Sequence, residues 1–193
     1  DLSLTNAHIP DDFANLGHTF VNLFAEHSGL TGPLPRSLAC MRMVIYFHLG
    51  RNAITEIPQY ALDRMMSLYS LDLSYNKLTG AVPSFSMNSE LRRLYLEHNE
   101  LVGDFGPQLV EFASFQDRGA LSAAHLSYND LSGPLPSVLY DLKTNAHRLT
   151  TVDVAGNHFR CEGDLGTFPS WAMRIGATSS FGQCTPVPKV FSV

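Results

Sequence analysis

Histidine and aspartate residues recur in this chain at positions that could bring them side by side. His48 and Asp72 occupy the same place in two successive copies of a repeated pattern, and His125 and Asp153 do the same further along. A neighbouring histidine and carboxylate can act as a catalytic dyad, contribute to a metal site, or form a contact whose strength changes with pH, because histidine titrates near neutrality. Each possibility makes different demands on the surrounding residues.

The residues around these His–Asp alignments favour ordinary side-chain contacts over a catalytic or metal site. Acyl-transfer chemistry also needs an activated nucleophile and an oxyanion site in a pocket, whereas Ser70 and Ser74 beside Asp72 would lie on an open surface. A metal ion needs three or four converging ligands, but His98 and His125 are offset by roughly 10 Å along their strands. We therefore expect no catalytic, metal or cofactor site, and only ordinary cross-strand pairs. A pH-sensitive contact with a ligand remains an open alternative.

The pattern that aligns these residues is a leucine-based repeat. Its clearest copy runs from Leu68 to Pro83 and reads Leu-x-x-Leu-x-Leu-x-x-Asn-x-Leu-x-Gly-x-Val-Pro. Seven copies can be aligned, and the positions that hold the asparagine or its substitute are Ala7, Ser28, Asn52, Asn76, Asn99, Asn129 and Asn157. A pattern repeated at this period predicts a solenoid in which each copy makes one turn.

Each part of the pattern has a physical role in such a turn. Leu-x-Leu predicts a short strand with both leucines inward, and successive strands would stack in parallel about 4.8 Å apart as a concave sheet. The asparagine amide can satisfy backbone groups where the chain leaves the strand, and neighbouring turns can share these bonds as a ladder. Glycine permits a tight bend and proline ends strand pairing, so that a convex return segment of short helices follows. Two long copies carry extra residues at 108–119 and 141–148, which we expect on the convex side.

This repeat resembles the leucine-rich repeat superfamily, and its Gly-x-Leu-Pro ending is similar to the plant-type class, which includes receptor-kinase ectodomains and polygalacturonase-inhibiting proteins. The resemblance implies an α/β solenoid: a right-handed superhelix of about seven turns with a concave parallel sheet. We expect repeats over residues 1–160, the first incomplete, a C-terminal cap over 161–185 and an extended tail over 186–193. The resemblance also implies a non-enzymatic module that recognises a protein or peptide.

Composition and charge narrow the expected partners. The chain has 193 residues, 45% of them hydrophobic, which suits one domain. Its net charge of −5 argues against nucleic acid or an anionic membrane as the main partner. No apolar run is long enough to span a bilayer, and no signal peptide begins the chain. We expect a protein that is processed or part of a larger one.

The cysteines bear on the expected compartment. Secreted members of the superfamily commonly close their cap with a disulfide, and the resemblance together with their placement predicts a bridge between Cys161 and Cys184. Cys40 is expected to be a small filler, buried or half-buried. An extracellular or cell-surface location follows from the paired cysteines. No asparagine begins an N-glycosylation sequon, so an organellar or cytosolic location stays open.

The outward positions of the concave strands are the expected partner-binding surface. Tyrosine and arginine are enriched at binding hot spots, although exposed strand positions also favour aromatic residues for structural reasons. A protein or peptide ligand is expected, and a glycan is left open. The predicted partner-binding residues are Tyr46, His48, Arg51, Asp72, Tyr75, Arg93, Tyr95, His98, His125 and Tyr128.

Two other functions remain as alternatives. The chain could be a structural subunit that packs in a larger assembly through its edges and convex side. Ala7 in the asparagine position would weaken the first turn and leave an edge for another chain to cover. A hydrolase using the His–Asp pairs is the third hypothesis.

Overall fold

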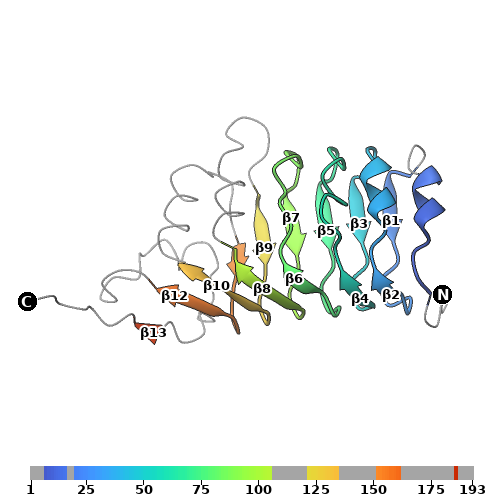
Figure 1. Ribbon diagram of the computed structural model, residues 1–193. Helices are drawn as coiled ribbons and strands as arrows, with labels where there is room; N and C mark the ends of the chain where they lie inside the picture. Colours follow the sequence, from blue (N-terminus) through green and yellow to red (C-terminus); the bar gives the residue numbers. More distant parts are fainter. Residues whose placement is uncertain (1–6, 17–19, 106–120, 135–150, 162–184, 187–193) are drawn as a thin grey trace, which may run out of the picture.

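The computed structural model describes residues 7–16, 20–105, 121–134, 151–161 and 185–186. Its strands are stacked side by side in chain order from the N-terminal to the C-terminal end, as Figure 1 shows. Each described turn contributes one strand to a first sheet and, after the asparagine, one strand to a second. The parallel solenoid predicted from the repeat is confirmed.

The first sheet is the predicted concave sheet. It contains six parallel strands in the order β1-β3-β5-β7-β9-β11. Successive strands pair in register, so that Phe47 lies opposite Leu71 and Leu71 opposite Leu94. The strands are β1 Asn22–Phe24, β3 Tyr46–His48, β5 Ser70–Asp72, β7 Arg93–Tyr95, β9 Ala123–His125 and β11 Thr151–Asp153.

A second sheet follows the asparagine of each turn. Its strands pair with a stagger: Thr79, three residues after Asn76, lies opposite Glu100, one residue after Asn99. Strands β13-β12-β10-β8-β6 form one part and β2-β4 the other. The strands are β2 Thr31–Pro33, β4 Ala53–Glu56, β6 Thr79–Ala81, β8 Glu100–Asp104, β10 Asp130–Pro134, β12 His158–Cys161 and β13 Thr185–Pro186. Sequence analysis assigned only a bend here and missed this sheet.

The gap between β4 and β6 has a cause in the sequence. In the copy that contains Asn52, the chain reads Thr55-Glu56-Ile57-Pro58, one residue shorter than the Thr-Gly-Ala-Val-Pro that follows Leu78. This copy therefore lacks the glycine position at which Gly80 and Gly103 continue the pairing, and the two turns are joined by a bond from the Lys77 N–H to the Ile54 carbonyl at 2.9 Å and one from the Thr79 hydroxyl to the Thr55 carbonyl at 3.3 Å.

The return segments are short, and the predicted helices are present in two of those that the structure describes, whereas residues 59–69 and 84–92 form turns and bends. Two 3₁₀ helices, η1 Asp11–Leu16 and η2 Arg36–Cys40, lie beside each other at the N-terminal end. The insertions expected at 108–119 and 141–148 lie outside the described residues. So do residues 162–184 of the cap expected over 161–185, including Cys184 of the predicted bridge, and residues 187–193 of the expected tail. No helix in the described part of the chain is long and apolar enough to cross a membrane.

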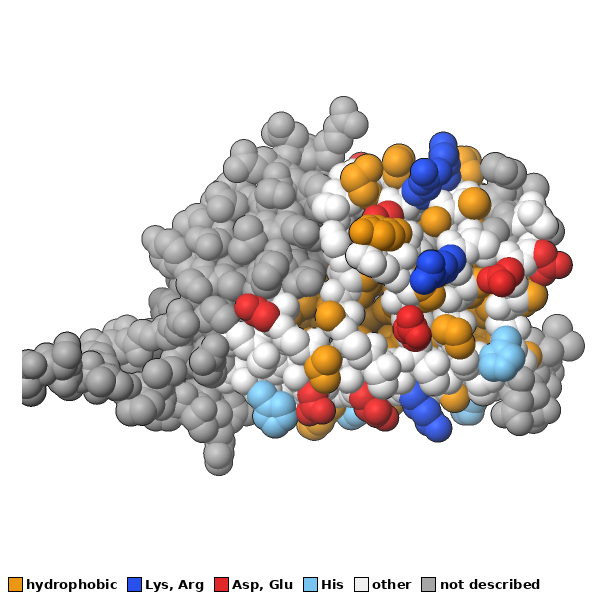
Figure 2. All heavy atoms as spheres, viewed as in Figure 1, with side chains coloured by type: hydrophobic (Ala, Val, Ile, Leu, Met, Phe, Trp, Pro, Cys, Tyr) orange, Lys and Arg blue, Asp and Glu red, His pale blue; other side chains and the backbone are white. Residues whose placement is uncertain are grey.

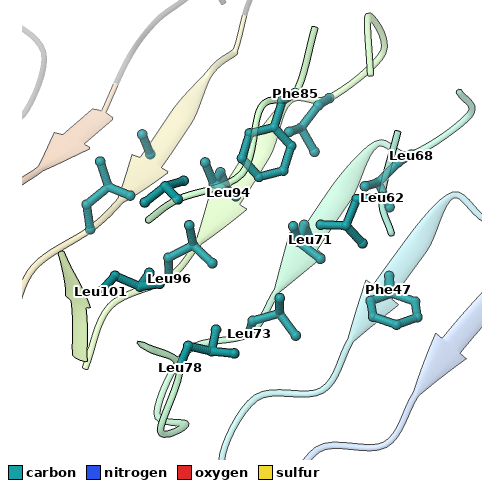
Figure 3. Packing of buried hydrophobic residues seen from close by; sticks show 14 of the residues in the cluster. Phe47, Leu62, Leu68, Leu71, Leu73, Leu78, Phe85, Leu94, Leu96 and Leu101 are labelled. Carbon is teal, nitrogen blue, oxygen red and sulfur yellow. The ribbon is translucent and has the colours of Figure 1, made fainter. Parts of the chain in front are cut away.

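The core lies between the two sheets and the return segments. Phe47, Leu71 and Leu94 of the concave strands are fully buried, and Phe85 reaches the same cluster from a return segment (Figure 3). Each turn therefore buries its leucines against the turns before and after it, which is the source of stability in a solenoid.

The asparagine ladder is present. The side-chain oxygen of Asn76 accepts a hydrogen bond from the backbone N–H of Ile54 at 3.0 Å, and its amide donates to the carbonyls of Leu49 and Leu73 at 3.0 and 3.1 Å. The side chain of Asn76 thus bonds to backbone groups of the preceding turn and of its own turn. The prediction of a structural role for this asparagine is therefore confirmed. The same arrangement recurs at Asn52, Asn99, Asn129 and Asn157.

Two predictions about the N-terminal turns are wrong. Ala7 pairs with Leu30, just as Gly80 pairs with Leu101, so Ala7 takes the glycine position of its turn and not the asparagine position. The asparagine position of that turn therefore falls outside the described residues, and the six concave strands account for six of the seven expected turns. Cys40 is exposed and not a core filler, because the buried positions of its segment are Leu38 and Met41.

Candidate functional site

The outward side of the concave sheet carries the residues predicted to bind a partner. In-register pairing places side chains from the same position of successive repeats in rows across the strands, with Tyr46 beside Ser70 and then Arg93. The next outward row contains His48, Asp72, Tyr95, His125 and Asp153. Rows of this kind let neighbouring side chains stack.

A third row follows the strands, at the residue directly before each asparagine. Its members all adopt a left-handed backbone conformation, with φ between 52° and 64°. This conformation is uncommon for bulky residues and costs of order 1 kcal/mol for each of them. Sequence analysis placed these side chains correctly but did not predict the conformation, although the glycine in the row was a signal of it. The residues are His27, Arg51, Tyr75, His98, Tyr128 and Gly156.

Four members of this third row form a continuous stack, which we call the stacked row. The Arg51 guanidinium lies 4.7 Å from the centre of the Tyr75 ring. The rings of Tyr75 and His98 are stacked at 4.2 Å, and those of His98 and Tyr128 at 4.4 Å, each pair inclined by 17°. Both faces of Tyr75 and His98 are therefore occupied by neighbours, and their edges are left for a ligand.

A second group of rings lies near the N-terminal end of the concave face, and we call it the aromatic cluster. Phe24 packs against Tyr46 at 6.2 Å and meets His48 edge-on at 5.1 Å. Tyr69 lies 5.8 Å from Tyr46, and the Arg93 guanidinium lies 5.8 Å from the Tyr69 ring. Phe24 is 56% exposed, so this cluster presents an open ring face. Sequence analysis did not select Phe24 or Tyr69 as binding residues. Phe24 had a signal in its outward position, which is equivalent to that of His48, whereas Tyr69 had only its aromatic type.

The two His–Asp alignments exist in the backbone register, but their side chains make other contacts. His48 hydrogen-bonds to the Ser70 hydroxyl through Nε2 at 2.9 Å, and its Nδ1 lies 3.5 Å from the Glu26 carboxylate. Asp72 accepts hydrogen bonds from the backbone N–H and hydroxyl of Ser74 at 2.9 and 2.7 Å. The expected His48–Asp72 pair is thus replaced, because Ser74 offers two donors within the same turn.

The second alignment behaves in the same way. The His125 ring stacks on Tyr95 at 5.0 Å. Asp153 accepts a hydrogen bond from the backbone N–H of Ala155 at 3.2 Å.

Ser70, His48 and Glu26 have the connectivity of a serine–histidine–carboxylate triad, but the geometry does not suit catalysis. Ser70 is only 1% exposed, so a substrate carbonyl cannot reach its hydroxyl. Across the described residues, no three histidine, cysteine, aspartate or glutamate side chains converge on a possible metal site.

Glu97 is an unusual carboxyl within this surface. Its Oε2 atom is buried without a hydrogen-bond partner. The pKa of this carboxyl is raised to about 7, first by burial and then by the carboxylates of Asp72 and Asp153, while its own backbone N–H acts in the opposite sense. Glu97 therefore changes charge near neutral pH, in the middle of the concave face.

Comparisons with known proteins agree with this architecture. A family model described as leucine rich repeat matches residues 45–101. Fibromodulin from Oryctolagus cuniculus is 30% identical over 161 residues, which cover 70% of this chain and 98% of that protein. Receptor-like protein 35 from Arabidopsis thaliana is 27% identical over 86% of this chain but only 18% of its own length.

A solved structure shows the same likeness. The leucine-rich repeat ectodomain of the plant membrane receptor kinase GASSHO1/SCHENGEN3 from Arabidopsis thaliana, in complex with CASPARIAN STRIP INTEGRITY FACTOR 2, superposes with a TM-score of 0.67 at 27% identity. The match covers 90% of this chain and 19% of that one. The chain thus spans about a fifth of the length of these plant receptors.

Proposed function

This chain belongs to the leucine-rich repeat family, with repeats of the plant type, and we propose that it is a non-enzymatic recognition module that binds a protein or peptide on its concave face. The observation that carries the proposal is the clustering of partly exposed rings there. Phe24 and Tyr128 are each 56% exposed and Tyr75 is 41% exposed. Exposed aromatic groups of this kind are typical of binding surfaces.

The backbone of the stacked row supports the same proposal. Arg51, Tyr75, His98 and Tyr128 all hold a conformation that glycine or asparagine would adopt with less strain. Bulky side chains at strained positions are often found where they serve a function. Stacking returns part of the cost, since an aromatic pair contributes about 0.5–1.5 kcal/mol beyond the area it buries.

The charges of the concave face suit a protein or peptide better than nucleic acid. The concave face carries two basic side chains, Arg51 and Arg93, beside four acidic ones, which are Glu26, Asp72, Glu97 and Asp153. The convex side and second sheet, shown in Figure 2, also carry acidic, basic and hydrophobic side chains interspersed with one another. A nucleic-acid surface would present a continuous basic patch.

The compartment that we propose is extracellular or cell-surface. Its support is the similarity to receptor-like proteins and to fibromodulin. Intact-mass measurement of the protein from its native source, with and without reduction, tests the predicted bridge between Cys161 and Cys184. Free thiols at both positions in the unreduced protein would show that the bridge is absent, and the cysteines would then no longer support an extracellular location.

The structural-subunit alternative loses one of the observations that motivated it. It rested on an N-terminal edge for another chain to cover and on Ala7 in the asparagine position. The pairing of Ala7 with Leu30 removes the second of these, because it places Ala7 elsewhere in its turn, and the edge itself stays a prediction.

The experiment that tests the proposed function starts from the native source. Affinity purification with mass spectrometry identifies the partner, and calorimetry then compares variants. We expect Tyr75→Ala and Tyr95→Ala each to weaken binding at least about tenfold, as for hot-spot residues, while the lost ring stacking lowers the midpoint of thermal unfolding by only about 2–4 °C. Met66→Ala on a return segment is the matched control, because Met66 is 46% exposed and should not affect affinity. Full affinity in both tyrosine variants would show that the partner binds elsewhere.

A further inference from the structure

The two ends of the stacked row differ. At the first end, the outer face of Tyr75 is covered by the Arg51 guanidinium at 4.7 Å. At the other end, the row reaches Gly156, which has the same left-handed backbone conformation (φ 64°) but no side chain. Among the described residues, the row therefore ends at a backbone position that carries no side chain of its own.

The exposure of the rings agrees with an open end. Tyr75, which lies between Arg51 and His98, is 41% exposed, whereas Tyr128 is 56% exposed. The ring of Tyr128 leans over the glycine, since a Cβ atom at Gly156 would stand 2.8 Å from its Cδ1 and 3.2 Å from its Cε1. In the described part of the chain, the ring contact of Tyr128 is with His98, on its inner face.

We propose that the outer face of Tyr128, above Gly156, is a subsite for a guanidinium group supplied by an arginine side chain of the partner. This inference rests on the proposed recognition on the concave face and specifies one of its contacts. The ligand group would complete the stack as Arg51 does at the other end, so that each terminal tyrosine ring is covered by a guanidinium.

Three features favour a guanidinium over other groups. The row consists of flat groups stacked nearly parallel, and a guanidinium is flat and stacks on aromatic faces, whereas an ammonium is a compact point charge. Asp153 on the neighbouring concave strand β11 is acidic, and so is Asp130 at the start of β10, where it lies 3.2 Å from Nε2 of His158. The chain as a whole has a net charge of −5, which also attracts a cationic group.

The test uses the full chain and a defined probe, N-acetyl-arginine methylamide, followed by NMR on the Tyr128 ring and the Gly156 amide. We expect saturable shifts of these two signals with a dissociation constant in the millimolar range, as a single small contact allows. The lysine derivative and the neutral citrulline derivative should each bind at least about fivefold more weakly, because one lacks the flat group and the other lacks the charge.

Matched variants locate the subsite. Gly156→Asn puts a side chain against the Tyr128 ring, because a Cβ atom there would stand 2.8 Å from Cδ1 and the ring must shift. Asparagine tolerates the left-handed conformation, so the backbone should be kept while the probe no longer binds. Tyr128→Leu should also abolish binding, whereas Tyr128→Phe should retain it. Arg51→Gly makes the first end of the row resemble the second, and we expect it to create a second probe site on the outer face of Tyr75.

Several outcomes would overturn the inference. These are no shift of the Tyr128 ring, equal binding of the lysine derivative, unchanged probe binding in Gly156→Asn, or binding of a neutral oligosaccharide to the same signals in preference to the arginine derivative. The proposed function fails separately. If Tyr95→Ala weakens partner binding while Gly156→Asn does not and the probe is silent, the concave face is the binding surface and the guanidinium subsite alone is wrong.

Discussion

The two sheets of this solenoid are built from the same turns and yet are organised differently. Concave strands pair position for position, as with His48 and Asp72, and run without interruption through six strands. In the second sheet, Ser132 lies opposite His158, which is two positions earlier in its own turn, and the pairing is interrupted between β4 and β6. Side chains can stack in rows only where equivalent positions are neighbours, so the register of the concave sheet is what makes the stacked row and the aromatic cluster possible.

The largest expected effect on stability comes from the core that lies between the two sheets. Leu96 is fully buried below the concave strand β7, and Leu96→Ala should lower the free energy of unfolding by about 3 kcal/mol through the cavity it leaves. Urea denaturation measures the change. Val102→Ala on the outer side of the second sheet is the control, because Val102 is 44% exposed and should change stability by less than about 0.5 kcal/mol. Similar losses for both variants would mean that the core is not where we place it.

A smaller effect concerns charge on the concave face alone. Because the pKa of Glu97 is about 7 in the folded protein and near 4.5 in the unfolded chain, the folded state holds the proton more tightly. The resulting stability is fully present below pH 4.5 and is lost as pH rises through 7. After allowance for solvent screening we expect a loss of roughly 1–2 kcal/mol.

The comparison of wild type with Glu97→Gln isolates the contribution of the Glu97 carboxyl to the free energy of unfolding. Thermal or urea unfolding between pH 4.5 and 8 should show that Glu97→Gln removes that part of the pH dependence and is the more stable protein at pH 8. A wild-type and variant pair with parallel pH profiles would contradict the raised pKa.

The interruption of the second sheet can be repaired. Insertion of a glycine between Thr55 and Glu56 restores the full motif length, so we expect β4 and β6 to pair regularly and the protein to gain about 1 kcal/mol from one or two added hydrogen bonds. Slower hydrogen exchange at the amides of β6 would report the pairing. If the insertion destabilises the protein and leaves these amides unprotected, the shortened repeat is not the cause of the gap.

The smallest effect concerns the stacked row. His98→Asn removes the ring between Tyr75 and Tyr128 but tolerates the left-handed backbone, and we expect a loss of about 0.5–1 kcal/mol. His27→Asn has the same chemistry and backbone conformation outside the four stacked residues, and calorimetry should find it neutral or slightly stabilising. Equal effects of the two changes would show that stacking adds nothing to stability.

The sequence predicted the elements whose cause is local and periodic. Leucine at Leu71 and asparagine at Asn76 determine the concave strand and the ladder, because one buries apolar surface at period two and the other satisfies backbone groups that the turn leaves open. Their spacing was therefore enough to place the rows of outward residues, including Tyr75 and Tyr95.

The remaining features depend on choices between nearby partners. Asp72 could bond to His48 across the strands or to Ser74 within its turn, and the local donors prevailed. Ala7 could be aligned by its distance from Leu4 or by the Ile9-Pro10 ending, and only the hydrogen-bond register shows that the ending is the correct guide. No pattern of residue types distinguishes such alternatives.

Oxidative footprinting of the protein with and without its partner tests the central claim most directly. The chain supplies its own internal comparison, since Phe24, Tyr75 and Tyr128 are exposed on the concave face and Tyr60 and Met66 are exposed on return segments. We predict that the partner lowers the oxidation of the concave residues and leaves Tyr60 and Met66 unchanged. Protection of Tyr60 and Met66, with the concave rings still reactive, would contradict the account.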